Sequence, residues 1–207
     1  MSKSLTQDVI SFVSKRVHSE LKASGWKRRA PHIFKPAGDV FHCLTFQSSR
    51  WGTLTEGQFT IDLVVTWPHV YRIWTSREFP RNPAAANFPI RERIGMLTPN
   101  HLDGWWHVNQ HTDREDLSKK VTSTLVAHGL SFFEPFPNTA AILALLRSGK
   151  PLPGLNEHQL PLIHAIMAAA IGEIQEAKER LSFAFKQASP LFQETVSLIA
   201  DRLKIEI

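Results

Sequence analysis

Four side chains that commonly bind metals lie close together between residues 101 and 111. If residues 107–111 are extended, His107, Asn109 and His111 share one face of the strand. A zinc or iron site needs at least three converging ligands and an open position. The chain contains no HExxH motif and no cysteine partner for these residues. One alternative hypothesis is therefore a metal-assisted hydrolase that uses His101, His107 and His111.

Other catalytic patterns are missing from the sequence. It has no G-x-S-x-G nucleophile elbow, no phosphate-binding loop of the Walker type and no dinucleotide fingerprint. The sole cysteine, Cys43, lies in the middle of an apolar alternating segment, where a buried and unreactive thiol is expected. A single cysteine also excludes an internal disulfide. We therefore expect a protein without enzymatic activity and without a cofactor.

Arginine, tryptophan and glutamine residues form a second group, which favours recognition over catalysis. Arginine and tryptophan are frequent anchors of protein interfaces, and arginine binds carboxylates through two parallel hydrogen bonds. A structural alternative remains open, in which the arginines pair with Asp62 or Glu92 and the tryptophans cover a sheet. The sequence favours recognition for Arg50 and Trp51 and a structural role for Trp105. The candidate binding residues are Gln47, Arg50, Trp51, Arg91, Arg93, Trp105 and Trp106.

The net charge of +5 is concentrated near the N-terminus. Residues 1–60 hold nine Lys and Arg against four Asp and Glu, whereas residues 151–207 hold five against seven. A continuous basic stripe from Lys22 to Lys35, with Arg50 on the same face, would bind phosphates, so a nucleic-acid-binding protein is another alternative hypothesis. The competing interpretation is a solvated strand whose charges keep its edge from pairing with other chains. The stripe would consist of Lys22, Lys27, Arg28, Arg29 and Lys35.

The elements that must position these residues begin with a helix over residues 5–24, for which Ser4 and Gln7 form a capping box. The apolar period then changes from helical to alternating, as is typical of strands. The connections between the alternating segments are too short for crossover helices, so we expect an antiparallel meander. The predicted strands are residues 26–29, 32–35, 40–47 and 59–67, with a further short strand near residues 105–108.

The middle of the chain combines a proline-rich stretch with a second helix. Five prolines between residues 68 and 100 predict a long loop without a stable element beyond a turn or two. A capping box at residues 112–115 starts a helix that is predicted over residues 113–128. An extended aromatic segment that contains Phe132, Phe133 and Phe136 is expected to follow.

The sequence from Lys150 to Gly154 is the best candidate for a domain boundary, because proline and glycine are concentrated in it. It divides the chain into an α+β domain over residues 1–150 and a helical extension over residues 151–207. The spacing of Ala165, Gly172, Ala177, Leu181 and Ala184 resembles that of a single tetratricopeptide-type hairpin over residues 158–189. Because one such unit cannot bury its apolar face alone, we favour a helical hairpin docked on the main domain over a peptide-binding array.

Three helices are expected in this extension. Asn156 and Gln159 begin the first, and Gly172 marks the turn into the second. The inner face of the second helix is predicted to consist of Ile174, Ala177, Leu181, Ala184 and Phe185.

Six short motifs follow one another between residues 5 and 137. They are GWK at 25–27, FQSSRWG at 46–52, FTIDL at 59–63, RERIGML at 91–97, WW at 105–106 and HGLSFF at 128–133. Their order and spacing resemble a mainly bacterial family known as domain of unknown function 4304 (DUF4304). The resemblance implies a shared α+β domain, and it implies no activity, cofactor or catalytic residue.

The expected architecture is therefore α+β. An antiparallel sheet of four to five strands is covered by helices near residues 5–24 and 113–128, and an all-helical extension follows. The longest apolar runs fall far short of the roughly 18 residues that suggest a membrane span. The first residues also lack the apolar stretch of a signal peptide. We expect a cytoplasmic protein that does not enter a membrane.

The leading functional hypothesis is a non-enzymatic module that binds another protein. The binding surface is expected at the sheet edge that carries the arginines and tryptophans, together with the proline-rich loop. By analogy at the level of the fold, an immunity-like or regulatory role matches a small protein with few motifs. The sequence leaves the identity of the partner and the oligomeric state open.

Overall fold

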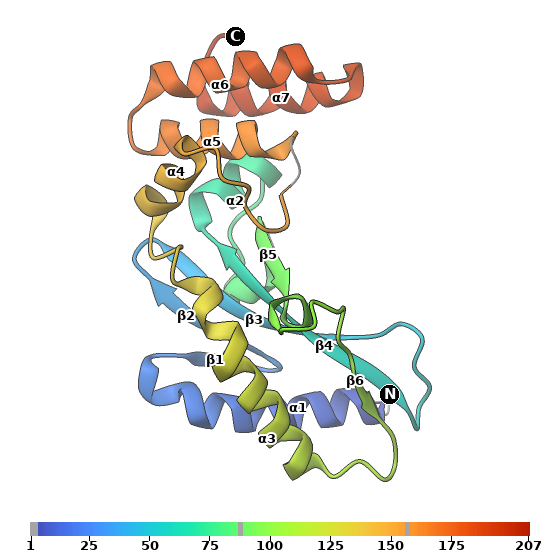
Figure 1. Ribbon diagram of the computed structural model, residues 1–207. Helices are drawn as coiled ribbons and strands as arrows, with labels where there is room; N and C mark the ends of the chain where they lie inside the picture. The colour runs from blue at the N-terminus through green and yellow to red at the C-terminus, as the bar shows by residue number, and fades with distance from the viewer. Residues whose placement is uncertain (1–3, 87–88, 156–157) are drawn as a thin grey trace.

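The computed structural model describes residues 4–86, 89–155 and 158–207. They form the expected α+β fold, with helices packed against an antiparallel sheet and three further helices stacked at one end. Figure 1 shows an elongated molecule in which the start of α1 (Leu5–Leu21) and the C-terminus lie at opposite ends. The helix start predicted at Asn156 lies outside the described residues.

The sheet contains six strands in the described part of the chain, slightly more than expected. Their order is β1-β2-β3-β4-β5, all neighbours are antiparallel, and β6 pairs with the first residues of β4. The meander from β1 to β4 confirms the prediction that short connections join antiparallel strands. The strands are β1 (Lys27–Arg29), β2 (His32–Ala37), β3 (Val40–Ser48), β4 (Gly57–Thr66), β5 (Ile90–Arg93) and β6 (Trp106–Val108).

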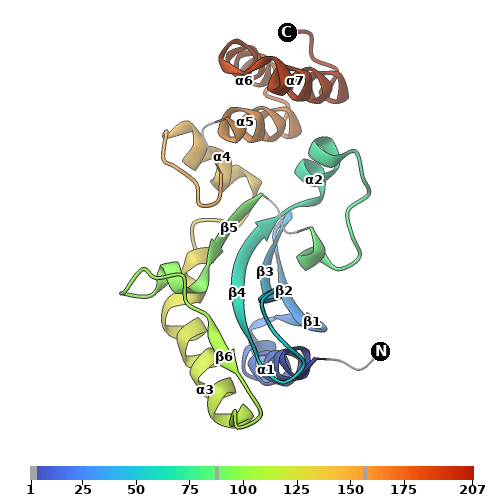
Figure 2. The ribbon, with the colours of Figure 1, turned by 90° about the vertical axis from the view of Figure 1, so that its right-hand side faces the viewer.

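The main core lies between the sheet and two helices. Helix α1 packs on β3 and β4, and α3 (Arg114–Thr124) packs beside α1. Figure 2 shows α1 next to the long, curved β4. Strand alternation brings Leu44, Ile61 and Leu63 to the covered face, where all three are buried. Burial of each such side chain contributes roughly 1.5–3 kcal/mol, so this face anchors the sheet.

The proline-rich stretch is more ordered than the sequence predicted. It contains α2 (Pro68–Thr75), strand β5, and two 3-10 turns at Pro83–Ala85 and Ile94–Leu97. Pro68 lies in the first turn of α2, where the missing N–H is not needed, and Pro83 opens its turn in the same way. The prediction of a long loop is therefore wrong, because these prolines begin elements instead of interrupting them.

The aromatic segment after α3 is not extended, contrary to the prediction. The helix continues through a π-helical turn at Leu125–Gly129 into a 3-10 turn at Leu130–Phe133. This path places the ring of Phe133 beside that of Trp26, with centroids 5.6 Å apart. The aromatic residues are buried as their type suggests, but a helical backbone delivers them to the core.

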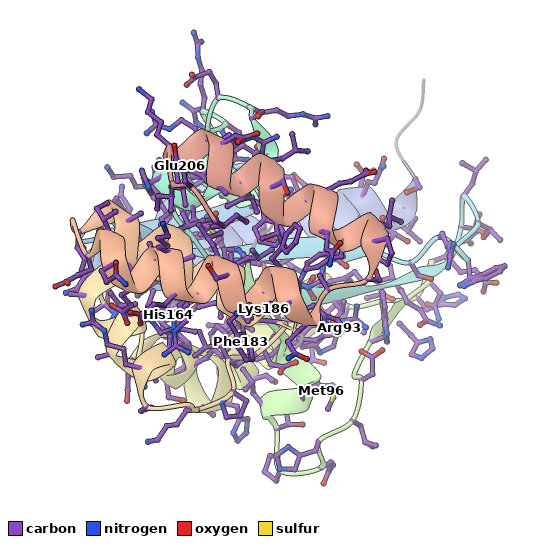
Figure 3. All side chains as sticks on the ribbon, turned by 90° about the horizontal axis from the view of Figure 1, so that it is seen from above. Arg93, Met96, His164, Phe183, Lys186 and Glu206 are labelled. Carbon is purple, nitrogen blue, oxygen red and sulfur yellow. The ribbon has the colours of Figure 1, made fainter. Side chains whose placement is uncertain are left out.

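The C-terminal part of the chain is entirely helical, as expected. Helix α5 packs on α2 and α4, and helices α6 and α7 pack on α5 (Figure 1). Figure 3 looks down on α6 and α7, which lie side by side. The helices are α4 (Thr139–Arg147), α5 (Gln159–Ala170), α6 (Ile174–Gln187) and α7 (Pro190–Leu203).

The extension docks on its own chain. Arg202 of α7 donates hydrogen bonds of 2.6 and 2.8 Å to the carbonyl oxygens of Ile73 and Trp74 at the end of α2. The predicted inner face of α6 is wrong at two positions, because Ile174 and Phe185 are exposed. The helix contacts α5 through a narrow face of small residues and one leucine. The domain boundary near residue 150 and the tetratricopeptide likeness remain predictions.

Candidate binding site

The structure divides six of the seven predicted binding residues into a paired group and an exposed group. The paired group surrounds Asp62, which lies in the middle of β4 and is 1% exposed. Gln47 donates from Nε2 to Asp62 Oδ2, Arg93 Nε lies 3.4 Å from Oδ1, and Arg91 Nη1 lies 3.7 Å from Oδ2. Each of these three residues therefore has an internal partner.

Arg93 links Asp62 to the segment before β6. Its Nη1 donates to both carboxylate oxygens of Asp103 at 2.6 Å, and its guanidinium carbon lies 5.1 Å from the ring centroid of Trp105. The hydrogen bond from Arg93 lowers the pKa of Asp103. Burial raises the pKa of Asp62, although Arg91 and Arg93 oppose the shift. We call Gln47, Asp62, Arg91, Arg93, Asp103 and Trp105 the Asp62 cluster.

The Asp62 cluster matches the structural alternative for its arginines. A cavity of about 340 Å³ lies beside it and is also lined by Met96 and Gly154. Figure 3 shows Arg93 and Met96 to one side of the α6–α7 layer. Trp106 belongs to neither group: it is half-buried and its ring stacks on Phe59 at 5.3 Å. The positive charges of this region are already compensated by carboxylates.

The exposed group lies in the loop between β3 and β4, residues 49–56, which we call the recognition loop. Trp51 is 84% exposed and Leu54 is 71% exposed. The guanidinium carbon of Arg50 lies 5.5 Å from the centroid of the Trp51 ring. The sequence singled out Arg50 and Trp51 but missed Leu54, because a lone leucine in a polar loop gives no distinctive pattern.

Several backbone hydrogen bonds hold the recognition loop in place. Ser49 N donates to Gln58 O at 2.8 Å, and Thr53 N donates to Glu56 O at 2.8 Å. Leu5 N donates to Leu54 O at 3.2 Å and connects the loop to the start of α1. The exposed side chains are therefore carried on a loop that is fixed at both ends and in the middle.

A second cavity, which we call the edge cavity, adjoins this loop and has a volume of about 390 Å³. It lies between α1 and the turn that joins β1 to β2. Burial lowers the pKa of His32, and the Nδ1 atom of His32 accepts a 3.2 Å hydrogen bond from the backbone N–H of Phe46. No sequence motif indicated this cavity. Its lining comprises Gln7, Ile10, Ser11, Ala30, Pro31, His32, Phe46 and Ser48.

The basic residues proposed for nucleic-acid binding do not all share one face. Strand alternation places Lys27 and Arg29 on one side of β1 and Arg28 on the other. Arg28 donates to Ser14 Oγ and Ser11 O of α1, and Arg29 donates to the carbonyl of Arg81. Of the remaining two, Lys22 begins the 3-10 turn after α1, and Lys35 is a half-buried residue of β2.

The histidines of the metal hypothesis lie in three different settings. His101 donates from Nδ1 to the carbonyl oxygen of Met96, 2.8 Å away, whereas His107 is an exposed residue of β6 and His111 lies in the following turn. Among the described residues no three His, Cys, Asp or Glu side chains are grouped to hold a metal ion. Cys43 is buried, and burial raises the pKa of its thiol.

Comparison with known proteins identifies one family. The family model described as Domain of unknown function (DUF4304) matches residues 17–135, more than half of the chain. This range includes the recognition loop and the Asp62 cluster. No curated protein and no solved structure matches the chain. No helix in the described residues is both long and apolar enough to cross a bilayer.

Proposed function

Because the chain belongs to the family described as domain of unknown function DUF4304, which brings no activity with it, we propose a function from the geometry: the protein is a non-enzymatic module that binds another protein through the recognition loop. The observation that carries this proposal is the exposure of Trp51. The side chain of Trp51 is 84% exposed, and the guanidinium of Arg50 lies over its ring. Tryptophan and arginine are the residues most enriched at interface hot spots.

The loop also has the rigidity that favours binding. An interface loses less conformational entropy when the binding loop is already ordered in the free protein. The hydrogen bonds of Ser49, Thr53 and Leu54 restrain the loop in this way. Trp51 and Leu54 favour a partner with an apolar pocket, and Arg50 favours a carboxylate at the rim of that pocket. An immunity-like or regulatory role is compatible with such a module.

The experiment compares three forms of the protein as baits in an extract of the source cells. They are the wild type, Trp51→Ala and Leu102→Ala, a control that removes another exposed apolar side chain from a different loop. The expected partner is captured by the wild type and by Leu102→Ala. Purified partner then binds Trp51→Ala about 30-fold more weakly, as expected for the loss of a hot spot. Equal retention of every captured protein by Trp51→Ala excludes the proposal.

A further inference from the structure

The edge cavity lies where strand β3 has no neighbouring strand on one side. The register pairs Ile33 of β2 with Leu44 of β3, so Pro31 lies opposite Phe46. Pro31 has no backbone N–H to donate to β3, and the residues that precede it turn away from β3 into β1. In the described part of the chain, no strand continues the pairing with β3 beyond this point. The end of β3 is therefore an open edge.

The hydrogen-bond pattern shows which backbone groups of this edge face the cavity. Ser49 N donates to Gln58 O, which makes the odd-numbered residues of β3 those that bond to β4. Phe46 and Ser48 consequently direct their backbone groups to the opposite side. The Phe46 N–H confirms this direction, because it donates to His32. The Phe46 carbonyl and both backbone groups of Ser48 have no partner among the described residues.

His32 adds a side-chain donor to this edge. A backbone N–H donates only to an unprotonated ring nitrogen, so Nδ1 of His32 carries no proton. The neutral ring therefore holds its proton on Nε2, and no described residue accepts it. The cavity also has apolar walls, formed by Ile10, Pro31 and Phe46. A volume of about 390 Å³ is near the lower end of the roughly 300–1,000 Å³ of small-ligand sites, which matches one or two side chains.

Two arginines lie close to the edge cavity, whose own lining residues are uncharged. Arg28 donates to the carbonyl of Ser11 in its wall, and Arg50 follows Ser48 by two residues. Residues 1–60 as a whole hold an excess of five positive charges. An acidic ligand is therefore complementary to this part of the surface.

We infer that the edge cavity binds an extended acidic peptide segment, which pairs with β3 at Phe46 and Ser48 and places one apolar side chain in the cavity. Strand addition of this kind gains affinity from main-chain hydrogen bonds and specificity from a side-chain pocket. The inference rests on the proposed function, since Ser48 leads directly into the recognition loop. According to this inference, the part of the partner that lies next to Trp51 is an extended acidic peptide segment.

The first test uses a short synthetic peptide in which glutamate alternates with leucine. Two matched peptides serve as controls: one is N-methylated at alternate residues and keeps every side chain, and the other has lysine in place of glutamate. We expect micromolar binding of the acidic peptide, with amide shifts at Phe46 and Ser48 in NMR spectra. N-methylation should weaken binding about tenfold, because it removes main-chain donors. Equal binding of the N-methylated or the lysine peptide overturns the inference, and so does an acidic peptide that does not bind.

The second test fills the cavity. Ser11→Phe adds a ring to its wall, whereas Ser19→Phe adds the same ring to an exposed position of the same helix. Peptide binding should fall at least tenfold in Ser11→Phe and stay unchanged in Ser19→Phe, with thermal melting as the check on folding. Unchanged binding in Ser11→Phe overturns the inference. If the partner found by capture depends on Trp51 but not on Ser11, the proposed function stands and only this inference fails.

Discussion

At the scale of single residues, Asp62 explains why the conspicuous arginines are not free to bind a partner. A carboxylate inside a sheet is costly unless charges and hydrogen-bond donors surround it. Arg91, Arg93 and Gln47 supply these groups. Trp51 has no comparable internal contact, since its only ring neighbour among the described residues is Arg50.

This account predicts that removal of Asp62 destabilises the protein. Asp62→Ala leaves Arg93 and Gln47 without their buried acceptor, so the free energy of unfolding should fall by about 2–4 kcal/mol. Asp103→Ala is the matched control, because it removes the exposed partner of the same Arg93 and should cost less than about 1 kcal/mol. Urea unfolding of the three proteins measures both values. Equal losses for the two variants contradict a central role for Asp62.

At the scale of elements, local signals identified the helices well and failed where tertiary packing decides the backbone. The Ser4 cap and the apolar period gave α1 to within a turn, and the alternating pattern gave the strands β3 and β4. The prolines of residues 68–100 did not reveal that Pro68 begins a helix, because proline is equally compatible with a helix start and a loop. The edge cavity was not predictable, since it forms between α1 and two strands distant from it in sequence.

Three helices of the C-terminal half meet at one carboxylate. Glu176 of α6 accepts from Nε and Nη2 of Arg147 on α4, and its Oε1 lies 2.7 Å from Nε2 of the buried His164 on α5. The hydrogen bonds from Arg147 lower the pKa of Glu176 to about 2. Figure 3 shows His164 next to α6. This contact fixes the position of the extension relative to α4.

Glu176→Ala is therefore expected to loosen the stack of α4, α5 and α6. The free energy of unfolding should fall by about 1–3 kcal/mol, because a buried histidine and an arginine lose their shared acceptor. Amide hydrogen exchange in α6 should become faster. Glu179→Ala is the control. Glu179 lies one turn further along the exposed face of α6 and contacts Gln175 of the same helix, so its removal should change neither the free energy of unfolding nor the exchange rate. The interpretation fails if the two variants behave alike.

At the scale of the whole molecule, one apolar core runs from the sheet into the helical extension. Residues of α1, β3, β4, α4, α5 and α7 belong to the same cluster of buried side chains. A continuous core favours cooperative unfolding in one step. We therefore expect the parts of the chain on either side of the boundary predicted near residue 150 to unfold together.

Buried histidines in both parts connect this cooperativity to pH. Burial lowers the pKa of His32 and His42 in the sheet and of His164 in α5. The unfolded chain therefore binds protons near pH 6.5 that the folded chain does not bind. Stability should be complete above about pH 6.5 and should fall as the pH drops below it. Asp103 and Glu176, whose pKa values are lowered by hydrogen bonds from arginines, affect stability only in more acidic solution.

Urea unfolding between about pH 7.5 and pH 5.5 tests this expectation with two probes. Circular dichroism is dominated by the helices, and tryptophan fluorescence reports mainly on the sheet and its loops. Both midpoints should decrease together as the pH falls, and His42→Gln should reduce the slope because one titrating group is lost. A midpoint that does not change with pH contradicts the histidine argument. Separate midpoints for the two probes contradict the single core and make the boundary near residue 150 a true domain division.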